Sequence, residues 1–238
     1  MLMLLLSGCR GADSPDVVRR APPEGSTSSE ASASSGRLRV VFMGTSITAG
    51  LGLDDPTDGY TSLIRATVDS LSLPFEIVNA GVSGETSAGG LRRAEWLFDL
   101  PTDVLVLELG ANDGLRGQSP EVMRANLQAI IEKARLRDPT MKLVIAGMEA
   151  PPNMGAEYVG AFRAVFGDIA TKNDGLLIPF LLDGVAGVRA LNQADGIHPN
   201  PDGHRHVAGT VWRIIEPLLR EVADERRAAD SVIGGNRQ

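Results

Sequence analysis

The apolar residues of this chain are concentrated in five short runs, which are separated by longer stretches of mixed polarity. Each run is four to eight residues long and shows little alternation between apolar and polar positions. This pattern is typical of strands that are buried on both faces of a sheet. The predicted strands are residues 37–44, 75–81, 103–110, 141–148 and 176–179.

Between and after these runs, apolar residues recur every three or four positions, which predicts amphipathic helices. The predicted helices are residues 60–71, 86–100, 119–138, 156–171 and 201–222. Ser119 and Pro120 provide a preferred N-cap and first helical residue for the third helix. Pro217 is expected to kink or end the last helix, and Trp96 and Trp212 are expected to face the core.

The alternation of apolar strands with helices predicts an α/β domain whose parallel sheet is covered on both faces. Residues 37–222 are expected to form this domain. Residues 10–36 are rich in Ser, Ala, Pro and Gly and are expected to be a disordered linker, and residues 223–238 a flexible tail. Functional side chains are expected in the loops that follow the carboxyl ends of the strands.

Composition and charge argue against several classes of partner. The chain is 43% hydrophobic and 22% charged, which is ordinary for a soluble globular protein. A formal net charge of -7 argues against a general nucleic-acid-binding protein, and it gives no support for binding to acidic membrane surfaces through a basic patch. The aromatic content of 4% argues against a platform for stacking bases.

Cys9 is the single cysteine, so the chain can form no internal disulfide, four-cysteine zinc site or iron–sulfur cluster. It ends the segment MLMLLLSGC (1–9), which resembles the lipobox of bacterial lipoproteins. The apolar run is too short to span a bilayer and lacks the basic n-region of a signal peptide. The resemblance implies lipidation of Cys9 and a periplasmic or other extracytoplasmic place in the cell envelope. A hydrophobic tail with no such role is the alternative.

Four loops carry the candidate chemistry of the domain. They are GTSITAG (44–50), NAGVSGET (79–86), LGANDGLRG (109–117) and DGIHPNPDGHRH (195–206). Ser46 places a hydroxyl in the first loop, Gly81 and Gly84 allow the backbone of the second to approach a ligand closely, and Asn112 offers amide donors in the third. Taken alone, each of these loops is more typical of an ordinary turn.

The fourth loop adds a histidine with a carboxylate three residues before it. Asp195 can accept a hydrogen bond from one ring nitrogen of His198, which leaves the other nitrogen to take a proton from a nucleophile. Serine, histidine and aspartate at one sheet edge are the parts of an acyl-transfer site. Gly81 and Asn112 supply donors for the oxyanion of such a site.

A metal site is the alternative use of this loop, because His198, His204 and His206 are the only histidines of the chain. His204 and His206 fall in the last predicted helix, where side chains two positions apart point in different directions. They are expected to be structural or surface residues, and no metal site is predicted.

In order and spacing, the four loops resemble the sequence blocks of the SGNH (GDSL-like) hydrolase family, over roughly Leu38 to Leu219. ELGANDGLRG and DGIHPNPDGH are especially similar to the branch that contains bacterial arylesterases, acyl thioesterases and lysophospholipases. The resemblance implies a flavodoxin-like three-layer α/β/α sandwich around a central parallel sheet. It also implies catalysis without a cofactor or a metal.

The resemblance further implies a role for each loop residue. Ser46 would be the nucleophile, His198 the general base, and Asp195 the residue that orients His198. The oxyanion hole would consist of the backbone N–H groups of Ser46 and Gly81 and the side chain of Asn112.

Two further residues near the predicted site are notable. Thr45 stands where the family usually has Asp, a difference that concerns the geometry of the nucleophile loop more than the triad. Glu108 ends the third predicted strand and is expected to be a core or edge carboxylate with a partner.

The predicted function is hydrolysis of acyl esters through an acyl-enzyme intermediate, carried out by a monomer. Aryl or short-chain esters, lysophospholipids and acyl thioesters are the expected substrates. A carbohydrate O-acetyl esterase and a non-catalytic envelope lipoprotein that binds a ligand are the alternatives. A nucleotide-binding protein is not favoured, because no GxGxxG or GxxxxGK[ST] loop follows the first strand.

Overall fold

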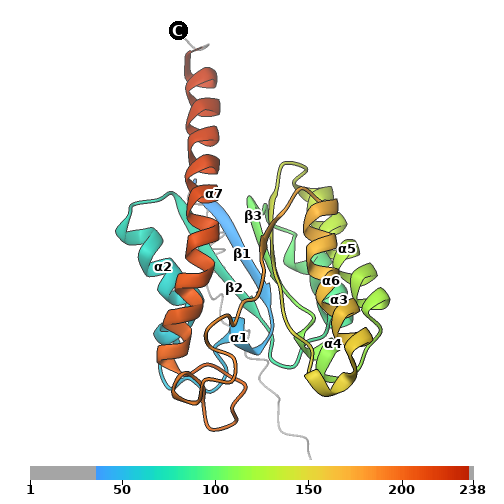
Figure 1. Cartoon of the computed structure of the whole chain (residues 1–238). Coiled ribbons are helices and arrows are strands. Elements are labelled where there is room, and N and C mark those ends of the chain that lie inside the picture. The colour runs from blue at the N-terminus through green and yellow to red at the C-terminus, as the bar shows by residue number, and fades with distance from the viewer. Residues whose placement is uncertain (1–35, 236–238) are drawn as a thin grey trace, which may run out of the picture. The chain divides into compact units, whose positions relative to one another are not determined.

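The computed structural model describes residues 36–235, and its central element is a five-stranded parallel sheet (Figure 1). The strand order is β2-β1-β3-β4-β5. The strands are β1 (Leu38–Gly44), β2 (Phe75–Gly81), β3 (Val104–Glu108), β4 (Lys142–Ala146) and β5 (Leu176–Ile178). The predictions for Cys9 and for the linker lie outside the described residues.

Helices cover both faces of this sheet, which confirms the predicted three-layer α/β/α architecture. In Figure 1, α2 and α7 lie on one face, and α3, α5 and α6 lie on the other. The longer helices are α2 (Tyr60–Ser70), α3 (Ser87–Leu97), α5 (Pro120–Arg137), α6 (Ala156–Lys172) and α7 (Pro201–Gly235). The short helices are α1 (Ser46–Ala49) and α4 (Ala111–Leu115), with the 3₁₀ turns η1 (Pro56–Asp58), η2 (Pro152–Met154) and η3 (Arg189–Leu191).

The chain changes direction across the sheet between β1 and β3. From β1 it moves outward to β2, and it then crosses back over β1 to β3 and continues in the same sense to β4 and β5. The loops after β1 and β3 therefore leave neighbouring strands toward opposite faces. Ligand sites of open α/β sheets lie in the crevice at such a switch point.

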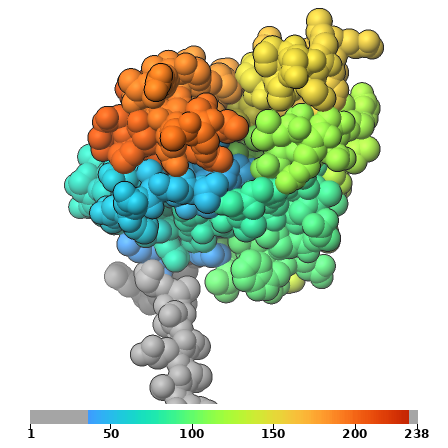
Figure 2. Space-filling view, turned by 90° about the horizontal axis from the view of Figure 1, so that it is seen from below, coloured from blue at the N-terminus to red at the C-terminus, as the bar shows by residue number. Residues whose placement is uncertain are grey.

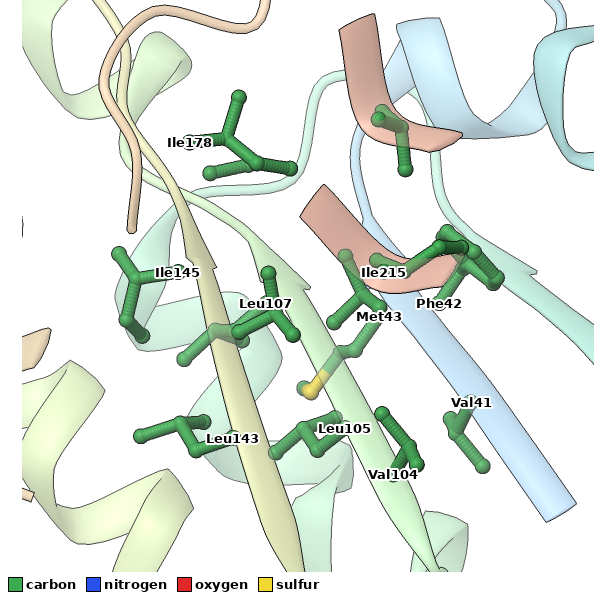
Figure 3. Packing of buried hydrophobic residues seen from close by; sticks show 14 of the residues in the cluster. Val41, Phe42, Met43, Val104, Leu105, Leu107, Leu143, Ile145, Ile178 and Ile215 are labelled. Carbon is green, nitrogen blue, oxygen red and sulfur yellow. The ribbon is translucent and has the colours of Figure 1, made fainter. Parts of the chain in front are cut away.

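The core is formed by the strands and by the helix faces packed on them (Figure 3). Phe42 packs edge-to-face on Tyr60 at a centroid distance of 5.8 Å, and its neighbour Met43 approaches Gly90 of α3 on the opposite face of the sheet. Both side chains are fully buried. This two-sided burial, at about 1.5–3 kcal/mol for each large apolar side chain, explains why the strands are continuous apolar runs.

Two sequence predictions differ from the structure. α7 does not end near residue 222 but continues through Pro217 to Gly235. Trp96 is 71% exposed, whereas Trp212 packs partly buried against the core. Ala94 and Phe98 bury the inner face of the last turn of α3, and Trp96 is rotated about 200° from each of them.

Within residues 36–235, no helix combines the length and the apolar character that are needed to cross a membrane.

Candidate active site

Ser46 lies two residues beyond the end of β1, at the first position of the short helix α1. Its side chain is largely buried, and its Oγ lies 2.8 Å from Nε2 of His198. α1 is a single turn that ends at Gly50, whose left-handed conformation (φ 74°) favours glycine. The hydroxyl is thus held at the carboxyl edge of the sheet on a short and tightly closed turn.

His198 is oriented by Asp195, as the spacing of the two residues predicts. Nδ1 of His198 lies 2.7 Å from Oδ2 of Asp195. The other carboxylate oxygen accepts the backbone N–H groups of Ile197 and His198, at 2.9 and 3.1 Å. Gly196 has a φ of 72°, which favours glycine and allows the tight turn between the two side chains.

This arrangement fixes the protonation states that the site can use. Because Asp195 accepts at Nδ1, the ring proton lies on Nδ1, and Nε2 is left to accept the hydroxyl proton of Ser46. The hydrogen bond from His198 and the two backbone N–H groups lower the pKa of Asp195 to about 2. Asp195 is therefore ionised throughout the neutral range.

Gln193 holds the histidine loop against the nucleophile loop, a role that the sequence analysis did not identify. Its side-chain amide donates to the carbonyl of Leu51, at 2.7 Å, and to that of Pro199, at 2.9 Å. Its backbone N–H donates to the carbonyl of His198 at 2.8 Å. A glutamine in a loop has no signature of its own, so only the position of Leu51 in space reveals this role.

Of the two glycines that the sequence singled out in the second loop, Gly84 lines the cavity at Ser46, whereas Gly81, the predicted oxyanion donor, does not. β2 extends through Gly81, which pairs with Gly44 in the sheet, and the Gly81 N–H donates to Oδ1 of Asn79. Gly84 lines the cavity at Ser46 together with Asn112, and its φ of 76° favours glycine. Within residues 36–235, the Gly84 N–H donates no hydrogen bond.

Asn112 lies in α4, just beyond β3, and lines the same cavity. The adjacent Asp113 is buried and accepts both the backbone N–H and the hydroxyl of Ser87, at 2.8 and 2.6 Å. Ser87 is the first residue of α3. This contact ties the loop that carries Asn112 to the loop that carries Gly84.

An ion pair fixes the loop of Gly84 from its other side. Arg93 contacts both carboxylate oxygens of Glu85 through Nε at 2.8 Å and also donates to the carbonyl of Ala80. Arg116 donates to the carbonyl of Gly84 at 3.1 Å. The backbone around Gly84 is therefore held on both sides, so the direction of its N–H group is fixed.

A cavity of about 440 Å³ opens beside Ser46 and His198. Its wall is mostly apolar, and it includes Ile47, Leu51, Leu115, Met148, Ala150, Pro151, Phe180, Leu182 and Ile197. Figure 2 shows this face of the domain, where the segments that contribute these residues surround a hollow. The carboxylate of Glu149, which also lines the cavity, pairs with Arg163 at 2.7 Å.

The three histidines of the chain occupy different surroundings. Both ring nitrogens of His198 are engaged by Asp195 and Ser46. His204 is buried, and its Nδ1 accepts the backbone N–H of Tyr60, whereas His206 is exposed. Among the described residues, no group of three or more acidic, histidine or cysteine side chains is arranged to hold a metal ion.

Comparison with known proteins places most of the described domain within one family. Residues 42–206 match the model of the GDSL-like lipase/acylhydrolase family. Esterase TesA of Pseudomonas aeruginosa is 39% identical over 181 residues, which cover 76% of this chain and 89% of that protein. The thioesterase 1/protease 1/lysophospholipase L1 of Escherichia coli strain K12 is 33% identical over 184 residues, covering 76% and 84%.

A solved structure gives the same result for the fold. The psychrotrophic esterase EstA of a Pseudoalteromonas species, in a structure inhibited by monoethylphosphonate, superimposes with a TM-score of 0.72 at 30% identity. The match covers 76% of this chain and 98% of that chain.

Proposed function

This chain belongs to the GDSL-like lipase/acylhydrolase family and is a serine ester hydrolase, and we propose that Ser46, His198 and Asp195 are its catalytic triad. The observation that carries the proposal is the continuous chain of contacts from Ser46 Oγ through the imidazole to the carboxylate, at 2.8 and 2.7 Å. A nucleophile, a base and an orienting group within hydrogen-bond reach are the requirement for this chemistry.

In the acylation step, Ser46 Oγ attacks the carbonyl carbon of the ester while Nε2 of His198 takes the hydroxyl proton. Asp195 stabilises the imidazolium through its contact with Nδ1. The carbonyl oxygen becomes an oxyanion. When the tetrahedral intermediate collapses, the bond to the alcohol or thiol breaks, and the leaving group takes the proton from His198. The acyl group remains on Ser46.

We assign the oxyanion hole to the backbone N–H groups of Ser46 and Gly84 and the side-chain amide of Asn112. All three residues line one cavity with His198. Ser46 is the first residue of α1, so its N–H has no partner within that helix. Donors fixed in advance around a developing negative charge are commonly the largest single contribution to such catalysis.

Deacylation repeats the sequence with water. His198 takes a proton from water, whose oxygen attacks the acyl carbon, and the same donors stabilise the second oxyanion. The bond to Ser46 Oγ then breaks, and the oxygen regains its proton from His198. The products are a carboxylic acid and the enzyme in its initial state.

We propose that the substrates are esters or thioesters with an apolar acyl group, lysophospholipids among them. The apolar wall and volume of the cavity suit an acyl chain, and its one carboxylate is neutralised by Arg163. The relatives described above are named as an esterase and as a thioesterase and lysophospholipase. Neither a carbohydrate esterase nor a non-catalytic binding role is favoured by these relatives.

We further propose that the enzyme works in the cell envelope as a monomer anchored through a lipid on Cys9. The segment that ends at this cysteine supports the proposal by its resemblance to a lipobox.

The test of the triad is hydrolysis of p-nitrophenyl acetate, butyrate and octanoate by the purified protein and by Ser46→Ala. The variant is expected to fold and to lose about 10²–10⁴-fold or more in kcat. Ser70→Ala, which removes an exposed serine at the end of α2, serves as the matched control. Wild-type turnover in Ser46→Ala would remove the triad assignment.

A further inference from the structure

Glu108 is a fully buried carboxyl group that has no step in the proposed acyl transfer. It is the last residue of β3 and is 1% exposed. Burial raises its pKa, and hydrogen bonds from Thr45 and Thr48 act in the opposite direction. Burying such a group is costly unless its hydrogen bonds are satisfied. A buried carboxyl at the edge of an active-site loop therefore calls for an explanation.

The hydrogen bonds of Glu108 lead directly to the nucleophile loop. Oε2 accepts the backbone N–H of Thr45 at 2.7 Å and the hydroxyl of Thr48 at 2.8 Å. Oε1 accepts the hydroxyl of Thr45 at 2.9 Å. Thr45 and Thr48 lie on either side of Ser46 in the sequence. Glu108 thus binds the backbone and side chains that flank the nucleophile to the end of the neighbouring strand.

A tyrosine extends this network into the next layer. The hydroxyls of Thr48 and Tyr60 lie 2.7 Å apart, and both residues are 1% exposed. Because Thr48 donates its single proton to Glu108, it must accept the proton of Tyr60. The phenol keeps that proton, since burial raises its pKa. The hydroxyls therefore donate in one sense, from Tyr60 to Thr48 and from Thr48 and Thr45 to Glu108.

The close approach of Glu108 to the loop requires a glycine at position 44. A Cβ at Gly44 would lie 2.1 Å from the hydroxyl oxygen of Thr48 and 2.5 Å from Oε2 of Glu108. These distances are far below van der Waals contact. The carboxyl group is therefore packed against the strand end from which the Ser46 loop departs.

We propose that Glu108 is a positioning residue that holds the backbone of Ser46 in the geometry needed for attack and for donation to the oxyanion. The inference rests on the proposed function of Ser46. Thr45 is a partner in this device, because both its N–H and its hydroxyl donate to Glu108. An aspartate at position 45, as is usual in the family, would offer a carboxyl group in place of that hydroxyl donor.

The proposal predicts different effects of two substitutions at this site. Glu108→Ala removes all of the acceptors, so the loop shifts, and kcat should fall about 10- to 100-fold with KM changed less than about threefold. Glu108→Gln can place its carbonyl oxygen where Oε2 lies and donate its amide to the Thr45 hydroxyl. This variant should recover most of the lost kcat.

The measurements are kcat and KM for p-nitrophenyl butyrate with the full chain. Thr102→Val is the matched control, because Thr102 lies two residues before the start of β3, is 2% exposed, and has a hydroxyl with no partner among the described residues. That control should leave kcat unchanged. Wild-type kcat in Glu108→Ala, or a loss in Glu108→Gln as large as that in Glu108→Ala, would overturn the proposal.

If Glu108→Ala does not fold, the double variant Thr45→Val, Thr48→Val provides the test. It removes two of the donors without changing side-chain shape, so a lower kcat at unchanged KM supports the proposal, and a wild-type kcat overturns it. The Ser46→Ala variant is read separately. Full turnover in Ser46→Ala defeats the proposed function whatever the Glu108 variants do.

Discussion

At the scale of single residues, His198 and His204 show how surroundings separate two identical side chains. His198 lies in a loop and bridges Ser46 and Asp195. His204 lies six positions further on, is 1% exposed, and stacks on the ring of Tyr60 at a centroid distance of 6.3 Å. Burial lowers the pKa of His204 to about 4, and of the smaller effects, the charge of Asp58 raises this pKa and the charge of His198 lowers it further.

His204 should therefore make the stability of the fold depend on pH. Its pKa in the fold is about 4, below the ordinary value of 6.5, so the unfolded chain binds the proton first as the pH falls. The contribution of neutral His204 is complete above pH 6.5 and is lost between pH 6.5 and 4. Protonation of this one group should make the free energy of unfolding about 2 kcal/mol lower at pH 5 than at pH 7.5.

His204→Asn tests this expectation by urea unfolding at the two pH values. An asparagine oxygen can take the place of Nδ1 as acceptor for the Tyr60 N–H, but it does not titrate. The variant should lose about 2 kcal/mol less than the wild type on going to pH 5. His206→Asn, on the exposed side of the same helix, should behave as the wild type. Equal losses in all three proteins would contradict the assignment.

At the scale of elements, α7 shows why a proline did not end a helix. Pro217 lacks the N–H that would donate to the carbonyl of Arg213, and both residues are exposed. Water can therefore hydrate the unpaired carbonyl. The residues around the proline on the inner face, Ile215, Leu218 and Leu219, are buried and hold the helix on the sheet. Tertiary packing thus outweighs the local preference.

Replacing Pro217 with alanine should consequently stabilise the protein. The variant regains one backbone hydrogen bond and relieves the contact of the proline ring with the preceding turn. The unfolded chain becomes more flexible without the proline, which offsets part of this effect, so the free energy of unfolding should rise by about 2 kcal/mol. Tm should rise by about 4–8 °C in a calorimetric scan. Pro201→Ala is the control, because Pro201 is the first residue of the same helix, where the missing N–H has no partner to lose. A rise in Tm for Pro201→Ala alone would contradict this explanation.

At the scale of the whole molecule, the site depends on the order of the strands. Ser46, Gly84, Asn112 and His198 come from four separate loops at the carboxyl edge, and 152 positions separate Ser46 from His198. Because β1 and β3 are adjacent in the sheet, the loops that carry Ser46 and Asn112 lie side by side. All of these residues lie between positions 46 and 198, so the proposed activity does not draw on the first 35 residues.

The proposed lipid anchor can therefore be tested without loss of the catalytic readout. In a bacterial host fed an alkyne analogue of palmitate, the full chain should be labelled and fractionate with membranes. Cys9→Ser should lose the label while its kcat on p-nitrophenyl butyrate is unchanged. Ser46→Ala should keep the label and lose the turnover. An unlabelled wild-type chain would refute the lipidation of Cys9.

Much of this protein could be predicted from the sequence because its pattern is local. Continuous apolar runs identified the five strands, and the alternation with amphipathic segments identified the three layers, since burial on one or both faces dictates polarity position by position. The pairing of Asp195 with His198 was also predictable, because three residues of chain hold the two side chains within reach of each other.

Other features were decided only in three dimensions. The sequence alone did not show that the Gly81 N–H donates to Asn79 while Gly84 lines the cavity, or that Trp96 faces solvent. It also did not reveal that Gln193 and Glu108 bind the nucleophile loop. The periodicity of apolar residues indicates which face of a helix or strand is buried. These contacts depend instead on how the strands pair and on which loops meet across the sheet. No local sequence pattern encodes the pairing or the meeting of loops.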